Sequence, residues 1–309
     1  MKRRAASPIT GQSKSSTDTA LQCRNTLATR YSAHSRLCAV VGIISKGGPV
    51  RAPFSLIQSV IKPLVKRPGG KTRMLKHLLP MIDGIPHKVY VEPFCGGAAV
   101  LVAKTPSEHE VINDIDGDLI NLYKQVKHHL PAVVRELRMM VESRQLFYEA
   151  KAQPGHTEIQ RAASYAYRNF YSFSGDNDSY GVKRIRFSTQ SYLLRKMVGM
   201  HRRLDRVTVE HLSWDRCLAL YDCPDALFFC DPPYTKGEVR AYSAWGTDDV
   251  VRLRDALSRL RGRWIVTLND CEANRAVFAG CQIKAVSTTA TISNKGQEPR
   301  RFGEIIITA

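Results

Sequence analysis

The chain of 309 residues is predicted to adopt a doubly wound α/β fold, in which a helical insertion interrupts a mostly parallel sheet and a β-hairpin ends the chain. Strand and helix signals alternate from residue 60 to 130, strand signals are then absent until residue 206, and they return up to the C-terminus. The run 226–230 is continuously apolar and ends at turn-forming residues, which is typical of a buried parallel strand.

The first part of the predicted sheet domain covers residues 60–130. Glycines open two of its helices, because glycine permits the tight turns that lead into them. Asp116 is placed to cap the last helix, and Asp118 to lie as a solvated acid in its first turn. The expected elements are helix 69–79, strand 89–91, helix 97–104, strand 110–113 and helix 116–128.

The insertion covers residues 131–205 and is predicted to be helical. Its apolar residues recur at helical spacing in three segments, and a polar loop over 174–182 separates the last two. The expected helices lie near 131–152, 158–172 and 189–204.

The second part of the sheet domain covers residues 206–309. A β-prone tail over 288–308 is divided by Gly296, which predicts a hairpin. The other expected elements are strands 207–210, 226–230, 264–268 and 282–285 and helix 247–260.

Residues 1–59 differ from the rest of the chain. Ser, Thr, Arg and Ala dominate and apolar periodicity is poor, so we expect a disordered basic extension. Because the fold signals begin near Ile61 and no Met lies between Met1 and Met74, a natural start at Val60 is a further hypothesis. Mass spectrometry of the natural protein would test it, and an intact N-terminal peptide would refute it.

The charge points to a polyanionic partner. The chain has 46 basic and 28 acidic residues, a net charge of +18, and residues 1–59 contain only nine of the basic ones. The remainder is therefore still basic, which favours nucleic acid over a membrane surface or an acidic protein. We expect a cytoplasmic protein, because no apolar run is long enough to span a membrane and polar sequence follows the basic start.

The eight cysteines predict neither a metal site nor a disulfide framework. They form no C-x-x-C pair and no Cys/His cluster with zinc spacing. Cys95 and Cys230 adjoin the motifs described below, where small buried thiols are expected rather than catalytic ones.

The most informative motif is Asp231-Pro232-Pro233-Tyr234, directly after the apolar run 226–230. A parallel strand delivers its C-terminal end to the crevice where open α/β sheets bind ligands. A carboxylate, a carbonyl in a rigid proline turn and an aromatic ring suit an amino group on a planar base. A strand-end turn with a surface tyrosine is the alternative for these four residues alone.

A second constellation follows the two earlier strands. Glycines at 96 and 97 allow the backbone to approach a ligand closely, although the pattern is not G-x-G-x-x-G and could serve packing only. Asp114 follows the next strand, about 20 positions further on, where an acid can accept from ribose hydroxyls.

Together these residues give the chain a specific resemblance. It resembles Dam-type N6-adenine DNA methyltransferases, in which the cofactor motif precedes the catalytic motif and the DNA-recognition insert lies between them. The matching motifs occur in the family's order over residues 60–309. They are Lys66…Gly69-Gly70-Lys71, Glu92-Pro93-Phe94-Cys95-Gly96-Gly97, Asn113-Asp114, Asp231-Pro232-Pro233-Tyr234 and Arg301…Glu304-Ile305-Ile306-Ile307-Thr308.

The resemblance implies a Rossmann-like methyltransferase sheet, S-adenosylmethionine as cofactor and double-stranded DNA as partner, without a metal. Asp231 and the Pro232 carbonyl would accept the hydrogens of adenine N6, and Tyr234 would stack on a flipped adenine. The residues it implies for cofactor binding are Lys71, Glu92, Phe94, Gly96, Gly97, Asp114 and Trp214.

The chain departs from the family pattern at three places. The family commonly has Trp-Ala where this chain has Arg67-Pro68, and often Asn where it has Asp116. Ser213-Trp214 occupies the place of a common Asp-Phe; Trp214 either covers the cofactor adenine or belongs to the core.

The insert is expected to bind DNA, because it mixes aromatic rings with cations and amides. Asn169 could read a base, and a capping or core asparagine is the alternative. The cations over 193–206 either contact phosphate or form a solvated helix face. The residues expected to contact DNA are Arg168, Asn169, Lys183, Arg184 and Arg186.

The sequence therefore predicts a monomeric, site-specific adenine methyltransferase. An N4-cytosine DNA enzyme, an RNA base methyltransferase and an inactive DNA-binding relative remain alternatives. A nicotinamide oxidoreductase is disfavoured by the missing fingerprint. The target site and an orphan, phage or restriction-paired role stay open.

Overall fold

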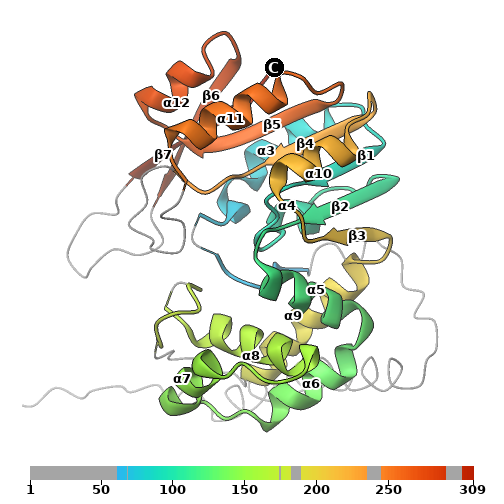
Figure 1. Ribbon diagram of the computed structural model, residues 1–309, viewed down its shortest axis with the longest axis vertical. Helices are drawn as coiled ribbons and strands as arrows, with labels where there is room; N and C mark the ends of the chain where they lie inside the picture. Colours follow the sequence, from blue (N-terminus) through green and yellow to red (C-terminus); the bar gives the residue numbers. More distant parts are fainter. Residues whose placement is uncertain (1–60, 68, 174, 182–188, 235–244, 290–300) are drawn as a thin grey trace, which may run out of the picture. The chain divides into compact units, whose positions relative to one another are not determined.

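A computed structural model describes residues 61–67, 69–173, 175–181, 189–234, 245–289 and 301–309 (Figure 1). All of the described residues belong to one compact unit. The predicted extension 1–59 lies outside the described residues, so its disorder and the alternative start stay predictions. The predicted boundaries of the insert within this unit also stay predictions.

The described residues form a seven-stranded sheet in the order β3-β2-β1-β4-β5-β7-β6. The first five strands in this order are parallel, and β7 runs antiparallel to both β5 and β6. This arrangement confirms the predicted α/β fold. The strands are β1 (Val89–Glu92), β2 (His109–Asn113), β3 (Val207–Glu210), β4 (Ala226–Cys230), β5 (Arg263–Asn269), β6 (Gln282–Thr289) and β7 (Arg301–Thr308).

The order of the strands places a topological switch point between β1 and β4. The chain runs outward from β1 through β2 to β3, and then returns to pair β4 with the other side of β1. In open sheets of this kind, ligands bind outside the carboxyl ends of the strands at the switch point. The glycine turn after β1 and the Asp-Pro-Pro-Tyr motif after β4 both follow strands at this point.

Helices α10 (Trp214–Tyr221) and α11 (Thr247–Leu257) cover one face of the sheet (Figure 1). Their buried residues, such as Leu218 and Leu253, form one core with strand residues such as Phe228 and Val266. All five residues of β4 are buried, which explains why its sequence is continuously apolar. The remaining elements beside the sheet are η1 (Lys71–Arg73), α3 (Leu75–Asp83), α4 (Ala99–Ala103), α5 (Gly117–His128) and α12 (Glu272–Val277).

The insert is helical, as predicted, and two of its helices pack against α8 (Glu158–Tyr171). Thr157 and Gln160 form a capping box at the start of α8, which fixes where this helix begins. Helix α8 contacts α5 of the sheet domain as well as its neighbours in the insert. The other helices of the insert are α6 (Leu130–Met139), α7 (Arg144–Ala152) and α9 (Thr189–Arg203).

Several expected elements were wrong in detail. The single helix expected over 131–152 is two helices, since the chain leaves helical geometry at Met140 and Ser143 caps α7. The short helices α10 and α12 were not predicted. The hairpin begins with β6 at Gln282 rather than at residue 288, and Gly296 lies outside the described residues.

A buried ion cluster ties α9 to β2. Glu110 accepts from Arg203 at 2.5 and 2.8 Å and lies 2.6 Å from the Nζ of Lys104. Burial alone would raise the pKa of Glu110, but the two cations hold it below its usual value. The cluster therefore fixes the end of the insert to the sheet through paired charges.

Candidate active site

Lys71, Asp231, Tyr234 and Glu304 meet at the carboxyl edge of the sheet. The Nζ of Lys71 lies 2.8 Å from Asp231 Oδ1 and 3.5 Å from Glu304 Oε2, and it donates to the Tyr234 hydroxyl at 2.7 Å. That hydroxyl donates in turn to Glu304 Oε2 at 2.7 Å. Four residues from three distant parts of the sequence thus form one hydrogen-bonded group.

The pairing of the strands explains this convergence. Cys230 pairs with Val266 on β5, so the next residues, Asp231 and Thr267, are also neighbours. Glu304 on the antiparallel strand β7 pairs with Asn269 at the carboxyl end of β5. The sheet therefore brings Asp231 and Glu304 together at its carboxyl edge, although no sequence motif joins these two residues.

Asp231 is held through one of its two oxygens. Thr267 donates to Oδ1 at 2.8 Å, and Lys71 contacts the same atom. Among the described residues, none forms a hydrogen bond or ion pair with Oδ2. Partial burial raises the pKa of Asp231, while Lys71 and Thr267 act to lower it, so Asp231 is a half-buried acceptor whose charge is favoured by Lys71.

Tyr234 is fixed as a neutral phenol. Burial raises its pKa well above the usual value, and the nearby carboxylates Asp231 and Glu304 raise it further. The ammonium group of Lys71 also lies 4.8 Å from the centre of the Tyr234 ring. The ring is therefore held in one orientation beside Asp231.

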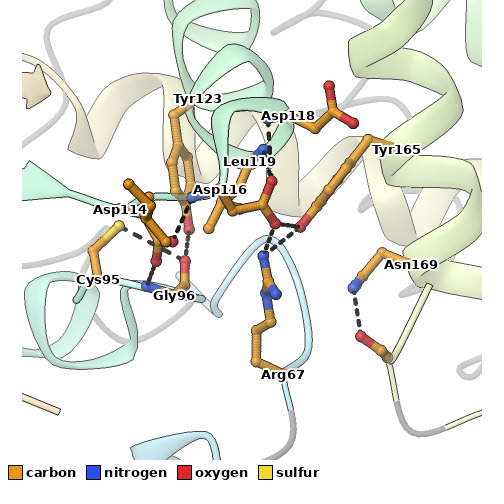
Figure 2. Close-up of polar contacts among 12 residues, drawn as sticks. Arg67, Cys95, Gly96, Asp114, Asp116, Asp118, Leu119, Tyr123, Tyr165 and Asn169 are labelled. Carbon is orange, nitrogen blue, oxygen red and sulfur yellow. Dashed lines mark hydrogen bonds and ion pairs between the residues drawn. The ribbon is translucent and has the colours of Figure 1, made fainter. Parts of the chain in front are cut away.

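The glycine turn after β1 is joined to the loop after β2. Gly96 has a φ of +47°, in the left-handed region that favours glycine, and its N–H donates to Asp114 Oδ2 at 2.9 Å. A Cβ at Gly97 would lie 2.9 Å from the Val65 carbonyl oxygen, so a larger residue would displace the backbone. The hydrogen bond places Gly96 beside Asp114 (Figure 2).

Asn113 is a structural link that the sequence did not single out as a site residue. Its side-chain amide donates to the Pro93 and Leu212 carbonyls at 2.9 and 3.1 Å, and its Oδ1 accepts from Leu212 N at 2.8 Å. It is fully buried. Asn113 thus joins the loops that follow β1, β2 and β3.

Glu92 is buried at the end of β1, with 2% of its surface exposed. Tyr90 donates to it at 3.0 Å, yet burial raises the pKa of Glu92 to about 7. This carboxyl group is therefore poised between its neutral and ionised forms near neutral pH.

Phe94, Trp214 and Trp245 form an aromatic cluster at the same edge. Phe94 stacks on Trp214 with ring centroids 6.2 Å apart and meets Trp245 edge-on at 5.6 Å. The Nε1 of Trp245 is buried and has no hydrogen-bond partner in the described part of the chain. Trp245 was not predicted, because nothing in its local sequence marks it.

Two of the residues expected to bind DNA are described by the structure, and three are not. Asn169 is buried, and its side chain bonds the backbone N and O of Lys66, each at 2.9 Å, and the Gly175 carbonyl at 3.1 Å, which favours the core alternative. The guanidinium of Arg168 lies over the Tyr165 ring at 5.9 Å. Lys183, Arg184 and Arg186 lie outside the described residues.

The cysteines near the site are buried thiols. Cys95 and Cys230 are free, and burial raises the pKa of each well above that of an exposed thiol. Within the described ranges, no group of three or more His, Cys, Asp or Glu residues could hold a metal ion. None of the described helices is long and apolar enough to cross a membrane.

A doubly wound sheet with a glycine turn after β1 and Asp-Pro-Pro-Tyr after β4 is the arrangement expected of a methyltransferase that acts on amino groups. The family model of the D12 class N6 adenine-specific DNA methyltransferase matches residues 68–292. The match covers more than half of the chain, which therefore belongs to this family of DNA adenine methyltransferases.

Similar proteins extend over nearly the same length. The chain is 24% identical over 274 residues to the type II methyltransferase M1.LlaDCHI of Lactococcus lactis, covering 80% of this chain and 95% of that protein. It is 24% identical over 260 residues to the retron Ec67 DNA adenine methylase of Escherichia coli, covering 79% and 90%. For the DNA adenine methylase of Vibrio cholerae, the identity is 23% over 263 residues, covering 78% and 94%.

Proposed function

We propose that this protein transfers a methyl group from S-adenosylmethionine to N6 of a flipped adenine at a specific site in double-stranded DNA. The observation that carries the proposal is the environment of Asp231. Lys71 and Thr267 hold its Oδ1, while Oδ2 has no hydrogen-bond or ion-pair partner among the described residues. Oδ2 can therefore accept a hydrogen from the amino group.

Adenine N6 is a weak nucleophile because its lone pair is delocalised into the ring. Asp231 would accept a hydrogen bond from one N6–H, and the Pro232 carbonyl would accept one from the other. Two acceptors in fixed positions favour a pyramidal nitrogen with a localised lone pair. This contribution is positioning and electrostatic preorganisation, and it requires no covalent intermediate.

Tyr234 would bind the base through its ring. Lys71 lies over the ring at 4.8 Å, and the base would stack on the opposite face. Stacking of a base on an aromatic side chain is worth about 1–3 kcal/mol. Because the Tyr234 hydroxyl is held by Lys71 and Glu304, little conformational freedom is left to lose when the base binds.

S-adenosylmethionine would supply a methyl group made electrophilic by the sulfonium. The glycine turn permits close approach, and the buried Nε1 of Trp245 lacks a partner among the described residues, so it offers a donor. Both features fit a polar ligand at this edge. The residues that would hold it are Lys71, Glu92, Phe94, Gly96, Gly97, Asp114, Trp214 and Trp245.

The insert would provide the DNA-binding surface. Arg168 and the basic residues Lys183, Arg184 and Arg186 remain the proposed contacts with DNA. Asn169 is better explained as the residue that holds the backbone at Lys66. Two of the cations over 193–206 serve the fold, because Lys196 donates to the Leu64 carbonyl and Arg203 binds Glu110. We propose that the protein acts as a monomer.

Nucleoside analysis tests the proposal. The protein is incubated with labelled S-adenosylmethionine and unmethylated duplex DNA, and the DNA is digested to nucleosides. We expect N6-methyladenine with the natural protein and none with Asp231→Ala. N4-methylcytosine would refute the choice of base, and unmodified DNA from a protein that binds the cofactor would refute the activity.

A further inference from the structure

Arg67, Asp116 and Tyr165 come from three separate segments and form one cluster (Figure 2). The Nη2 of Arg67 donates to Asp116 Oδ2 and, at 2.7 Å, to the Tyr165 hydroxyl. The Tyr165 hydroxyl donates to the same Asp116 oxygen at 3.0 Å. The cluster thus joins the segment before η1, the loop after β2 and helix α8 of the insert.

Each member of the cluster is suited to its contacts. Tyr165 is 3% exposed, and burial raises the pKa of its phenol, so the group stays a neutral donor. Asp116 uses both oxygens: Oδ2 binds Arg67 and Tyr165, while Oδ1 caps α5 by accepting from the N–H groups of Asp118 and Leu119 at 3.1 Å. The predicted cap is confirmed, and a second role for the same carboxylate appears beside it.

A hydrogen-bonded path leads from the cluster to the glycine turn. The N–H of Asp116 donates to Asp114 Oδ1 at 3.0 Å, and Asp114 Oδ2 accepts from Gly96 N at 2.9 Å. The side chain of Arg67 also lies near the turn, because its Cγ would be 3.9 Å from a Cβ placed on Gly96. Tyr165 on the insert is therefore only a few hydrogen bonds from the residues proposed to hold the cofactor.

Helix α8 grips the same segment a second time. Asn169, one turn after Tyr165, bonds both backbone polar groups of Lys66. Lys71 follows five residues later and contacts Asp231. Helix α8 thus holds the backbone at Lys66, in the segment that leads to Lys71 and its contact with Asp231.

We propose that Arg67, Asp116 and Tyr165 are positioning residues that couple the DNA-recognition insert to the cofactor-binding loops. Positions 67 and 116 both depart from the family pattern, and in this chain the two departures contact each other. The guanidinium of Arg67 balances the carboxylate of Asp116, and both side chains are half-buried. This inference rests on the proposed function, because it assumes that the glycine turn and Asp114 bind S-adenosylmethionine.

The test compares two tyrosines on α8. Tyr165→Phe removes only the hydroxyl that reaches Arg67 and Asp116. Tyr167→Phe is the matched control, because Tyr167 is also buried but its hydroxyl bonds the Val141 and Ser143 carbonyls within the insert. We expect Tyr165→Phe to raise the Kd for S-adenosylmethionine about 5- to 10-fold, and Tyr167→Phe to change it less than about twofold.

A second variant separates coupling from loss of stability. Asp116→Asn removes the charge, while asparagine remains a good helix cap. If the Asp116 carboxylate and the Tyr165 hydroxyl act together, their losses should not add. The double variant Asp116→Asn/Tyr165→Phe should then bind the cofactor no more weakly than the weaker-binding of the two single variants. At saturating cofactor, Tyr165→Phe should regain the natural rate of methyl transfer, so that KM for the cofactor changes and kcat does not.

The outcomes separate this inference from the proposed function. If the natural protein fails to bind S-adenosylmethionine, the proposed function itself is refuted. If the natural protein binds it and Tyr165→Phe binds it equally well, or if Tyr167→Phe weakens binding as much, the coupling alone is refuted. Should Tyr165→Phe fail to fold, Asp116→Asn decides by the same measurement, since unchanged cofactor binding there contradicts the inference.

Discussion

Asp231 lies between two opposing influences. Burial raises its pKa, while Lys71 at 2.8 Å favours the charged form. A carboxylate in such surroundings is a stronger hydrogen-bond acceptor than one in water, because the low local dielectric strengthens its interactions. In the proposed function, Lys71 therefore keeps the half-buried Asp231 able to accept a hydrogen bond from a neutral amino group.

Glu304 holds both Lys71 and Tyr234, so its charge should matter to the reaction. We expect Glu304→Gln to lower the kcat of methyl transfer by about 10- to 100-fold, the effect of one hydrogen bond to a charged group. Steady-state kinetics with duplex DNA would measure it. Glu272→Gln, at an exposed acid on α12, is the control and should retain the natural rate. Equal rates in the two variants would contradict the role of Glu304.

Glu92 predicts a pH-dependent stability. Burial raises its pKa to about 7 from 4.5, so the folded state binds more protons than the unfolded state between these values. Stability contributed by this group is therefore lost as the pH rises from about 4.5 to about 7. Glu92→Gln lacks this loss. Its free energy of unfolding, relative to that of the natural protein, should therefore rise by about 3 kcal/mol between pH 5 and pH 8. Urea unfolding at both pH values measures it, and parallel pH profiles would contradict it.

At the scale of elements, continuous apolar runs and glycine turns could be predicted from sequence. Residues 226–230 are apolar throughout because β4 is buried on both faces, and the motif after it follows directly. Lys71, predicted from one motif, lies against Asp231 and Tyr234, which were predicted from another. Thr267 could not be predicted, because only the pairing of β5 with β4 makes it a neighbour of Asp231.

Other features depend on tertiary contacts that leave no local signal. Helices α10 and α12 are short, with 8 and 6 residues, and show too few turns for a helical period to stand out. The contact of Arg67 with Tyr165 joins residues 98 positions apart. The sequence marked Arg67 and Asp116 separately as departures, and only the fold shows that they are partners.

The buried cluster of Lys104, Glu110 and Arg203 gives a prediction for α9. Arg203→Met should destabilise the protein by about 3–5 kcal/mol, because it leaves the buried Glu110 with one partner fewer. Arg202→Met, at the adjacent half-buried position, is the control and should cost less than about 1 kcal/mol. Denaturant unfolding measures both, and equal losses would contradict the predicted role of Arg203 in stability.

At the scale of the whole molecule, the charge of +18 should govern binding to DNA. If 6–10 phosphates are contacted, the affinity for duplex DNA should fall by about 10³–10⁵ between 50 and 200 mM salt. Fluorescence anisotropy with a labelled duplex measures the salt dependence. An affinity that does not change with salt would contradict a basic DNA-binding surface.

In the proposed function, the fold as a whole places Asp231 where the amino group of the base is held during methyl transfer. Single-turnover methyl transfer to unmethylated duplex DNA, with cofactor and DNA both saturating, compares the natural protein with Asp231→Asn most directly. We expect the rate constant to fall by at least about 10²–10³, as for loss of one preorganised hydrogen-bonding group. A rate within about tenfold of the natural protein would contradict the central role of Asp231.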